Sequence, residues 1–449
     1  MVNKKNKRNK LSGNKPIVDF IKVQRHFFKD LSKWIDELED PRNKSYITYT
    51  QQDLFYLGIL KNVCGIKTMR QMNEKFNEEE CINSLSFMAE DKKLKELPDF
   101  TTLNNYLEKL SPKCLSDLRN KMVTSLIRSK AFNKNRLLGK YWVIILDGTG
   151  LFHFKEKHCE NCLVTTHTDD DGTKHKHYYH KVLEAKIVLS DSIVISLGTE
   201  FIENEKEDVK KQDCENAAAK RLLERIKKEH PRLRICVLGD ALYGVEPVMK
   251  ICKEYGWKYV FNLKEGTQKN IVKDYDYLEN DMKNVMRILL GVEKGTGSFY
   301  NHMEKITGKE EIFNVFTYEY SKVKKQKEQK VKFMWVTNIE INPKKLKELI
   351  EVGRKRWKIE NEGFNNQKNG IYQIEHLNSR NSNAMKNHYL LTQIADILMQ
   401  LYLNCDEIVK KVNESIKNTS SRLLESFRIH IITEEDVLHI SRYTTIHFE

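Results

Sequence analysis

The pattern of hydrophobic and polar positions divides the chain into a helical first part, a strand-rich middle and a helical end. Near the N-terminus, Phe27, Leu31, Trp34, Ile35 and Leu38 recur three and four residues apart, as one face of an amphipathic helix requires. Similar patterns predict helices over residues 52–64, 68–77, 101–110 and 115–129. Short helices with tight connections are the raw material of a helix-turn-helix, and the expectation that this region binds DNA depends on the motifs that follow it in the chain.

The pattern changes after Gly139. Residues 141–146 form a continuous apolar run of strand length, which suits a central strand covered on both faces, and Asp147 follows it. A second such run, residues 234–238, precedes Gly239 and Asp240. Further strands are predicted over 183–189, 193–198, 258–263 and 333–337, and helices over 205–228, 246–255 and 343–366. These elements predict a mixed α/β sheet.

The remaining segments complete a five-part organisation. Residues 265–332 are polar, with short alternating stretches, and indicate a β-rich insertion; helices follow to the C-terminus, of which 389–403 is the most apolar. We therefore expect a basic flexible tail over 1–15, a helical DNA-binding domain over 16–136, an α/β core over 137–264 and 333–400, a β-rich insertion over 265–332 and a C-terminal helical region over 401–449.

The excess of basic over acidic residues indicates that this globular protein has a polyanionic partner. The net charge is +14 and the pI is about 9.1, so nucleic acid is the first candidate partner, because each neutralised phosphate releases a counterion. Residues 1–15 hold six basic residues and no acidic one. They suit a solvated tail and equally an arm that touches phosphates.

The composition also limits the cellular compartments in which we expect the protein. No apolar run approaches the ~20 residues of a membrane span, and no secretory signal follows the basic N-terminus, so we expect a cytoplasmic protein and no membrane partner. The nine cysteines do not suggest a disulfide framework in a chain of 449 residues. We expect most of them to be reduced thiols in hydrophobic cores.

Three acidic residues are the candidate catalytic groups. Asp147 and Asp240 each follow a core strand, where a rigid sheet can hold a side chain in a fixed position. Divalent cations such as Mg²⁺ prefer carboxylate oxygens, and two ions ~4 Å apart can activate the attacking oxygen and stabilise the leaving one. A third carboxylate normally completes both coordination spheres.

Glu360 is the candidate for that third carboxylate. On a regular helix it lies three residues after Trp357 and four before Phe364, on the apolar face. Glu362 then points about 200° away. A buried carboxylate needs a partner, and either a metal ion or Arg356, one turn earlier, could provide it. We also expect Trp257, Trp335 and Trp357 to pack in the core.

The combination of these motifs resembles the DDE insertion-sequence transposases, which have an RNase H-like catalytic fold. The resemblance covers roughly residues 139–400 and rests on VIILDGTG, ICVLGDALYG and GRKRWKIENEGFNNQK, with further likeness in YYHKVLEAKIV, KQDCENAAAKRLL and WKYVFNLKEG. It places the family's two aspartates and glutamate on Asp147, Asp240 and Glu360. The 119 residues between Asp240 and Glu360 are typical of the branch with a β-rich insertion before the glutamate helix.

That branch carries a Tyr-Arg-Glu-Lys signature on the glutamate helix, and this chain matches it in part. Arg356 and Glu360 keep the spacing, but Gly353 stands in the tyrosine position. Gln367 stands in the lysine position, with Lys368 one residue later, and a slip of one residue turns a side chain on an α-helix by about 100°.

The resemblance implies a fold, a reaction and partners. The expected fold class is α/β: an RNase H-like mixed-sheet core with a β-rich insertion, preceded by an all-helical DNA-binding region and followed by C-terminal helices. The expected enzyme uses two Mg²⁺ or Mn²⁺ ions at Asp147, Asp240 and Glu360 to cleave transposon ends and join them to target DNA.

Double-stranded DNA is the expected partner, bound by a homodimer on paired ends in the bacterial nucleoid, with Arg356 and Lys368 contacting its backbone. Two alternatives remain open at this point. They are a domesticated DNA-binding regulator and an RNase H-like nuclease without strand transfer.

A second constellation indicates a different metal. Cys159 and Cys162 have the CxxC spacing of zinc ligands, and a histidine pair, of which we choose His175 and His177, could complete a tetrahedral site. The run of three aspartates over residues 169–171 instead suggests an exposed loop without metal. Both interpretations stay open at the level of sequence.

Overall fold

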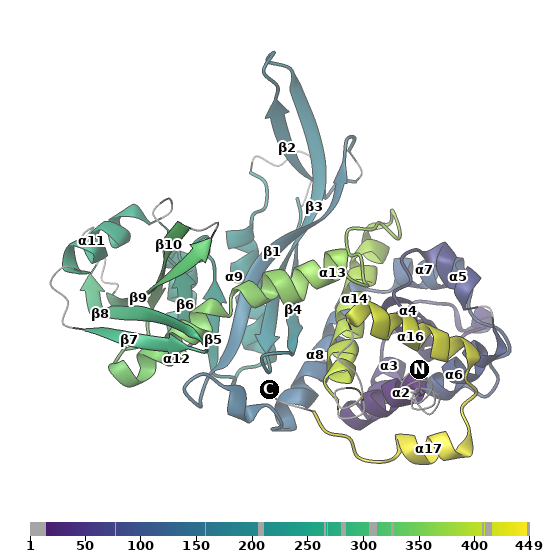
Figure 1. Cartoon of the computed structure of the whole chain (residues 1–449). Coiled ribbons are helices and arrows are strands. Elements are labelled where there is room, and N and C mark those ends of the chain that lie inside the picture. The colour runs from purple at the N-terminus through teal and green to yellow at the C-terminus, as the bar shows by residue number, and fades with distance from the viewer. Residues whose placement is uncertain are drawn as a thin grey trace. The chain divides into compact units, whose positions relative to one another are not determined.

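The computed structural model describes residues 15–76, 78–157, 159–204, 211–264, 266, 268–279, 284–304, 312–324, 327–405, 408 and 415–446. Within these ranges the side chains of residues 279, 304, 323–324, 327 and 360–362 are not described. The chain forms two compact units (Figure 1). One is helical and comprises residues up to 130, 190–196 and 365 onwards; the other is α/β and comprises 131–189 and 197–364.

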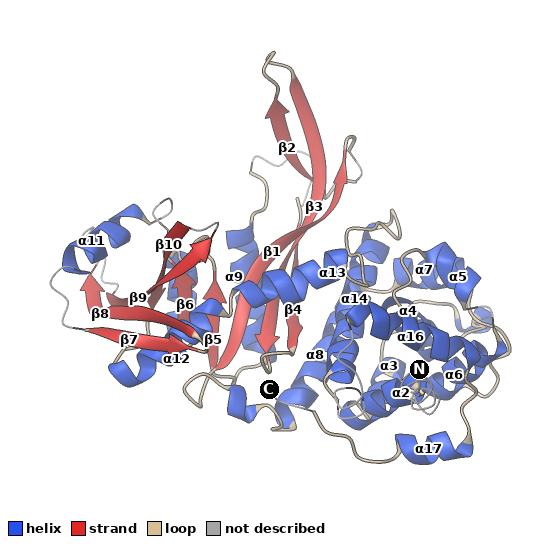
Figure 2. Ribbon diagram, in the orientation of Figure 1, coloured by secondary structure: helices blue, strands red, loops and turns tan. Residues whose placement is uncertain are grey.

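A ten-stranded mixed sheet is the framework of the α/β unit (Figure 2). Its strands are β1 (Trp142–Phe154), β2 (Leu163–Thr168), β3 (Lys174–Val188), β4 (Val194–Ile202), β5 (Ile235–Gly239), β6 (Lys258–Asn262), β7 (Val285–Leu290), β8 (Glu293–Glu304), β9 (Ile312–Lys324) and β10 (Lys327–Thr337). The most apolar runs, at the start of β1 and throughout β5, are buried as predicted for central strands.

The order of the strands confirms the RNase H-like core. Strand β4 pairs with β3, β3 pairs antiparallel with β1, and β1, β5 and β6 pair in parallel. The predicted β-rich insertion continues the same sheet, because β10 pairs antiparallel with β6 and leads outwards to β9, β8 and β7. The insertion is therefore an extension of the catalytic sheet.

Helices of the α/β unit pack on this sheet. They are α9 (Glu215–Glu229), α10 (Glu246–Glu254), α11 (Lys269–Glu279) and α12 (Pro343–Arg354), with a short 3₁₀ turn, η2 (Asn133–Asn135). Helix α9 contacts β3 and α10, and α12 contacts β6, β7, β8 and β9. Of the helix predicted over residues 205–228, residues 205–210 lie outside the described ranges and α9 begins at Glu215.

The helical unit combines both ends of the chain. It contains α2 (Pro16–Phe27), α3 (Leu31–Asp36), η1 (Lys44–Tyr46), α4 (Gln51–Val63), α5 (Met69–Lys75), α6 (Glu79–Ala89), α7 (Phe100–Lys109), α8 (Pro112–Arg128), α13 (Asn366–Asn369), α14 (Ser382–Leu403), α16 (Ile416–Ile429) and α17 (Glu434–Ile440). The apolar helix α14 contacts α2, α4, α7 and α8. Residues 365–400, which we expected in the α/β core, pack here instead.

Two expectations about composition can be compared with the structure directly. All nine cysteines are free thiols, and six of them are buried, as predicted for core residues. Across the described ranges, no helix combines the length and apolar character that crossing a bilayer requires. Of the predicted basic tail, residues 1–14 lie outside the described ranges; the ammonium of Lys15 lies 2.6 Å from Asp436.

Candidate active site

The register of the parallel strands brings Asp147 and Asp240 to the same level of the sheet. The last paired residues of β1 and β5 are Ile145 and Leu238, and each aspartate lies two residues further along its chain. Because side chains alternate along a strand, each aspartate is on the same face as the paired residue before it. We predicted that this strand ends at Asp147, but β1 continues to Phe154 and pairs there with β3 alone.

Local backbone groups orient the two carboxylates. The Gly148 amide donates to Asp147 Oδ1 at 3.0 Å, and the Leu242 amide donates to Asp240 Oδ1 at 2.8 Å. Each bond uses one oxygen of its carboxylate.

The electrostatics of Asp147 are those of a crowded acidic site. Burial raises the pKa of Asp147 to about 6, and the negative charges of Asp240 and Glu215 act in the same direction. The Arg356 guanidinium opposes this shift from 4.0 Å, measured between its Nη1 and Asp147 Oδ2. A partly buried site with several carboxylates fits a divalent cation, because the cation offsets their mutual repulsion and carboxylate oxygens are the ligands that such cations prefer.

Glu215, Lys181 and Tyr243 belong to the same site, although the sequence analysis did not select them. Glu215, at the first turn of α9, forms an ion pair with Lys181 of β3 and accepts a hydrogen bond from the Tyr243 hydroxyl. A Cβ atom on Gly148 would lie 2.6 Å from the Glu215 carboxylate, so the glycine allows that carboxylate to approach β1. Lys181 and Glu215 fall within the stretches that carry the family resemblance, but their chemistry becomes evident only through these contacts.

The segment that carries Glu360 differs from the long helix we predicted. Helix α12 ends at Arg354, and residues Ile359–Asn365 form a π-helix, η3. Such wide turns, with i→i+5 hydrogen bonds, occur frequently at functional sites. The backbone of Glu360 lies in this turn, whereas its side chain lies outside the described part of the chain.

The π-helix also corrects the predicted placement of Trp357. This tryptophan is 46% exposed, whereas Trp257 and Trp335 are buried as predicted. The 3.6-residue period no longer applies once α12 has ended, so the apolar stripe we drew through Trp357 breaks there. Within η3, Ile359 and Phe364 are buried, five residues apart.

The structure explains why the signature tyrosine is absent. A Cβ atom on Gly353 would lie 2.7 Å from the Trp335 ring, which is itself buried and stacked on Phe316. No side chain fits between α12 and this indole.

The predicted lysine position belongs to a polar network in the helical unit. Gln367 is buried and donates to Gln393 and Asp396 at 3.0 Å each. Lys368 lies in α13, with its ammonium 2.7 Å from Glu375.

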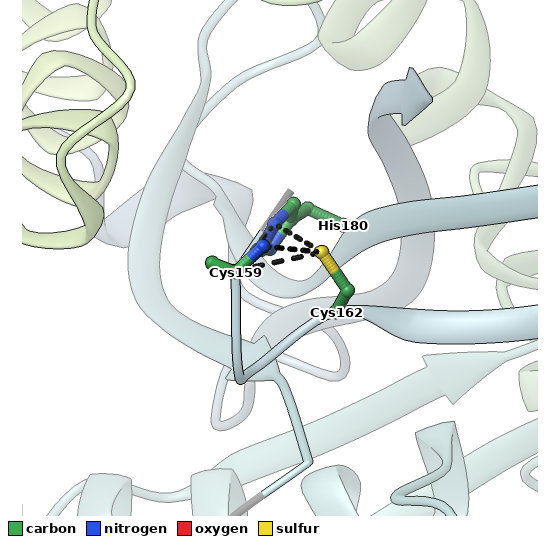
Figure 3. Close-up of side chains that lie close together, drawn as sticks. All are labelled: Cys159, Cys162 and His180. Carbon is green, nitrogen blue, oxygen red and sulfur yellow. Dashed lines mark hydrogen bonds between the residues drawn. The ribbon is translucent and has the colours of Figure 1, made fainter. Parts of the chain in front are cut away.

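The cysteine motif forms a compact cluster, with a different histidine from those we chose (Figure 3). The sulfurs of Cys159 and Cys162 are 3.5 Å apart, and His180 Nε2 lies 3.3 and 3.5 Å from them. Burial raises the pKa of Cys159 to about 11, and the Cys162 thiol adds to this shift. His175 instead lies 3.0 Å from Asp169, and His177 contacts the His167 ring, both nearer the tip of the β2–β3 hairpin.

Among the described residues, this cluster is the one group in which three such ligand atoms lie within 4.8 Å of one another. Of the three predicted metal ligands at the carboxylate site, the two aspartates have described side chains. The third predicted ligand is Glu360.

Comparison with known proteins places the chain in a family. A family model described as a transposase DDE domain matches residues 138–395. No curated protein matches the chain significantly. Among solved structures, the cryo-EM structure of a piggyBac transposase synaptic complex with hairpin DNA is similar, with 10% sequence identity, a TM-score of 0.45, and coverage of 94% of this chain and 84% of that chain. Because the family model spans more than half of the 449 residues, the chain belongs to the transposases that carry a DDE domain.

Proposed function

We propose that this transposase cleaves DNA at transposon ends and joins the released 3′ ends to target DNA, with Asp147, Asp240 and Glu360 as its catalytic carboxylates. The observation that carries the proposal is the register of β1 and β5, which sets Asp147 and Asp240 side by side in a member of the DDE family. A pair of fixed carboxylates on a rigid sheet is the arrangement that metal-dependent phosphodiester chemistry requires.

Transposases of this family generally use divalent metal ions. We propose two Mg²⁺ or Mn²⁺ ions, held by Asp147 and Asp240 together with Glu360. Each bound cation would supply Lewis-acid stabilisation of the phosphate and a lowered pKa of the attacking hydroxyl or water. The crowding of negative charge around Asp147 supports this assignment, because a bound cation offsets the cost of keeping that carboxylate ionised.

The chain's own basic groups complete the site. Arg356 holds positive charge 4.0 Å from Asp147, where it favours the ionised carboxylate and can contact a DNA phosphate. Lys181 holds Glu215 in place beside Gly148. Lys368 remains a proposed DNA contact, and in that role it would exchange Glu375 for a phosphate oxygen.

DNA binding is assigned to double-stranded transposon ends and target, with the N-terminal helical region reading the ends. The net charge of +14 supports a polyanionic partner. We further propose a homodimer on paired ends, because joining two ends to one target requires both in a single assembly.

The test is a cleavage and joining assay. The purified protein is mixed with Mg²⁺ or Mn²⁺ and a labelled duplex that carries the flanking ends of its own gene, beside Glu360→Ala. Glu351→Ala is the matched control, because Glu351 is an exposed glutamate of α12 paired with Lys347. Metal-dependent cleavage and joining that is lost only in Glu360→Ala supports the proposal.

Two other outcomes favour the alternatives. Tight binding without cleavage by any of the proteins favours a DNA-binding regulator. Cleavage without joined products favours a nuclease of the same fold.

A further inference from the structure

The Cys159–Cys162 loop lies at the base of a two-stranded β-hairpin that has almost no core of its own. Strands β2 and β3 pair from Leu163 with Tyr179 to Thr168 with Lys174, and the hairpin extends beyond the rest of the sheet (Figure 2). The last three residues of β2 and the first four of β3 are exposed. An isolated hairpin of this kind is only marginally stable in water, so it needs an additional constraint at its base.

Three side chains converge at that base from two separate segments. Cys159 and Cys162 come from the loop that enters β2, and His180 comes from β3, where it pairs with Phe152 of β1. Cys162 and His180 are almost fully buried, at 4% and 5% exposure. The rings of Phe152 and Phe154 lie edge-on to the imidazole, at 6.3 and 6.2 Å.

The separations between the three ligand atoms match those around a single tetrahedral zinc ion. Zn–S bonds of about 2.3 Å and Zn–N bonds of about 2.05 Å imply about 3.8 Å between sulfurs and about 3.6 Å between sulfur and nitrogen. The observed values are 3.5 Å between the sulfurs and 3.3 and 3.5 Å to Nε2. A disulfide would need the sulfurs at about 2.05 Å and gives no role to the histidine that contacts both of them.

The surrounding residues hold the loop in the geometry of a metal-binding turn. The Cys159 amide donates to the Cys162 sulfur at 3.4 Å, which brings the two cysteines together within one turn. Asn204 donates from its side chain to the Cys162 carbonyl at 2.9 Å, and Gln212 bonds both the amide and the carbonyl of Val164. These bonds connect the loop and the first residues of β2 to Asn204 and Gln212.

We propose that Cys159, Cys162 and His180 bind a zinc ion that fastens the entry of β2 to β3 and thereby holds the β2–β3 hairpin in a fixed orientation. Binding releases the two thiol protons and joins positions that enclose residues 163–179, which lowers the entropy of the open hairpin. This site is separate in chemistry from the carboxylate site, since soft sulfur and imidazole ligands select zinc whereas carboxylates select Mg²⁺ or Mn²⁺. The proposal goes beyond transposition and does not depend on it.

Zinc content tests the ligand set. The full chain is produced in zinc-replete medium, dialysed without chelator and measured by elemental mass spectrometry, beside Cys162→Ser and His180→Ala. The matched controls are Cys214→Ser, an exposed cysteine outside the cluster, and His175→Ala, a histidine of the same hairpin. We expect one zinc per chain in the parent and both controls, and loss of most of it in the two cluster variants. Zinc lost in His175→Ala but kept in His180→Ala would overturn the assignment.

Two further measurements do not depend on how the variants fold. The parent protein reconstituted with Co²⁺ should show a thiolate-to-metal absorption band and the intense visible bands of tetrahedral cobalt. Limited proteolysis of the parent should become at least about tenfold faster within the hairpin after zinc is removed, because local opening exposes its backbone. No metal after reconstitution, or a Cys159–Cys162 disulfide in protein purified under reducing conditions, would overturn the proposal.

Discussion

The carboxylate pair and the sulfur–imidazole cluster are both reached by strand β1, but the fold holds them in different ways. Asp147 lies where β1 leaves its parallel partner β5, in the middle of a wide sheet with helices packed on it. The cluster lies near the C-terminal end of β1, where His180 pairs with Phe152 and the two-stranded β2–β3 hairpin begins.

The difference shows what each region needs from a metal ion. The carboxylate region lies on a wide sheet, and Asp240 and Glu215 raise the pKa of Asp147, so a bound cation would offset that repulsion and supply chemistry. The outer part of the hairpin is exposed and has little core, so an ion at its base would act as a cross-link between the cysteine loop and β3.

The largest expected effect separates the two regions by activity. Asp240→Ala should lower metal-dependent cleavage by roughly 10³-fold or more, because it removes a ligand that acts in the transition state. His180→Ala should lower cleavage far less, by about tenfold at most, because it alters the hairpin alone. Both are measured by strand cleavage at saturating Mg²⁺, with the exposed Asp170→Ala as control. Retained metal-dependent cleavage in Asp240→Ala would refute the catalytic assignment.

Arg356 tests whether the carboxylate region depends on compensating charge. Arg356→Ala should reduce cleavage by about 10- to 100-fold, because the carboxylate of Asp147 loses the cation 4.0 Å away. Arg356→Lys should recover part of that loss, since it keeps the charge but not the planar guanidinium. Equal loss in both variants would show that guanidinium geometry, rather than charge, is the important property.

The ionised carboxylate of Asp147 should lower the stability of the metal-free protein at neutral pH. Its folded pKa is about 6, above the ordinary 3.8, so the folded state binds this proton more tightly than the unfolded state. Asp147 therefore contributes most to the free energy of unfolding below pH 3.8. Its contribution falls as the pH rises from 3.8 to about 6 and is constant at higher pH. Asp147→Asn should accordingly stabilise the metal-free protein at pH 7 by about 1–3 kcal/mol and have little effect near pH 4.

This change is measured by thermal unfolding in EDTA across that pH range. The exposed Asp170→Asn serves as the control. An unchanged midpoint at pH 7 would mean that the charge crowding around Asp147 carries no cost.

The smallest expected effect concerns the hydroxyl that holds Glu215. Tyr243→Phe removes one buried hydrogen bond and should cost about 1 kcal/mol of stability, with cleavage reduced less than about tenfold. Tyr277→Phe is the matched control, because that tyrosine is 80% exposed. A loss of cleavage as large as that of Asp240→Ala would instead make Tyr243 part of the catalytic machinery.

The core of the fold was accessible from the sequence because burial leaves a simple signal. The apolar runs before Asp147 and Asp240 predicted two central strands, and the structure pairs them in parallel. The same reasoning missed β2 and the first half of β3, since exposed strands of polar residues lack a hydrophobic alternation. The exposed loop predicted from the aspartate run 169–171 is the turn between these two strands.

The candidate sites were less accessible because contacts across strands decide them. His180 differs from His175 and His177 only in its place in the register, opposite Phe152 at the base of the hairpin. Glu215 approaches β1 through the space that Gly148 leaves, which no local pattern indicates. The π-helix around Glu360 likewise has no periodic signal, so helical spacing placed Trp357 on the wrong face.

The length of the β2–β3 hairpin has a mechanical consequence. From His180 to Lys174, strand β3 spans roughly 20 Å at about 3.3 Å per residue, so a tilt of only about 10° at the base displaces the tip by roughly 3.5 Å. A small change in angle at the cysteine loop therefore produces a much larger displacement at the tip of the hairpin. Any partner that is contacted at the tip is located only as accurately as Cys159, Cys162 and His180 are held together.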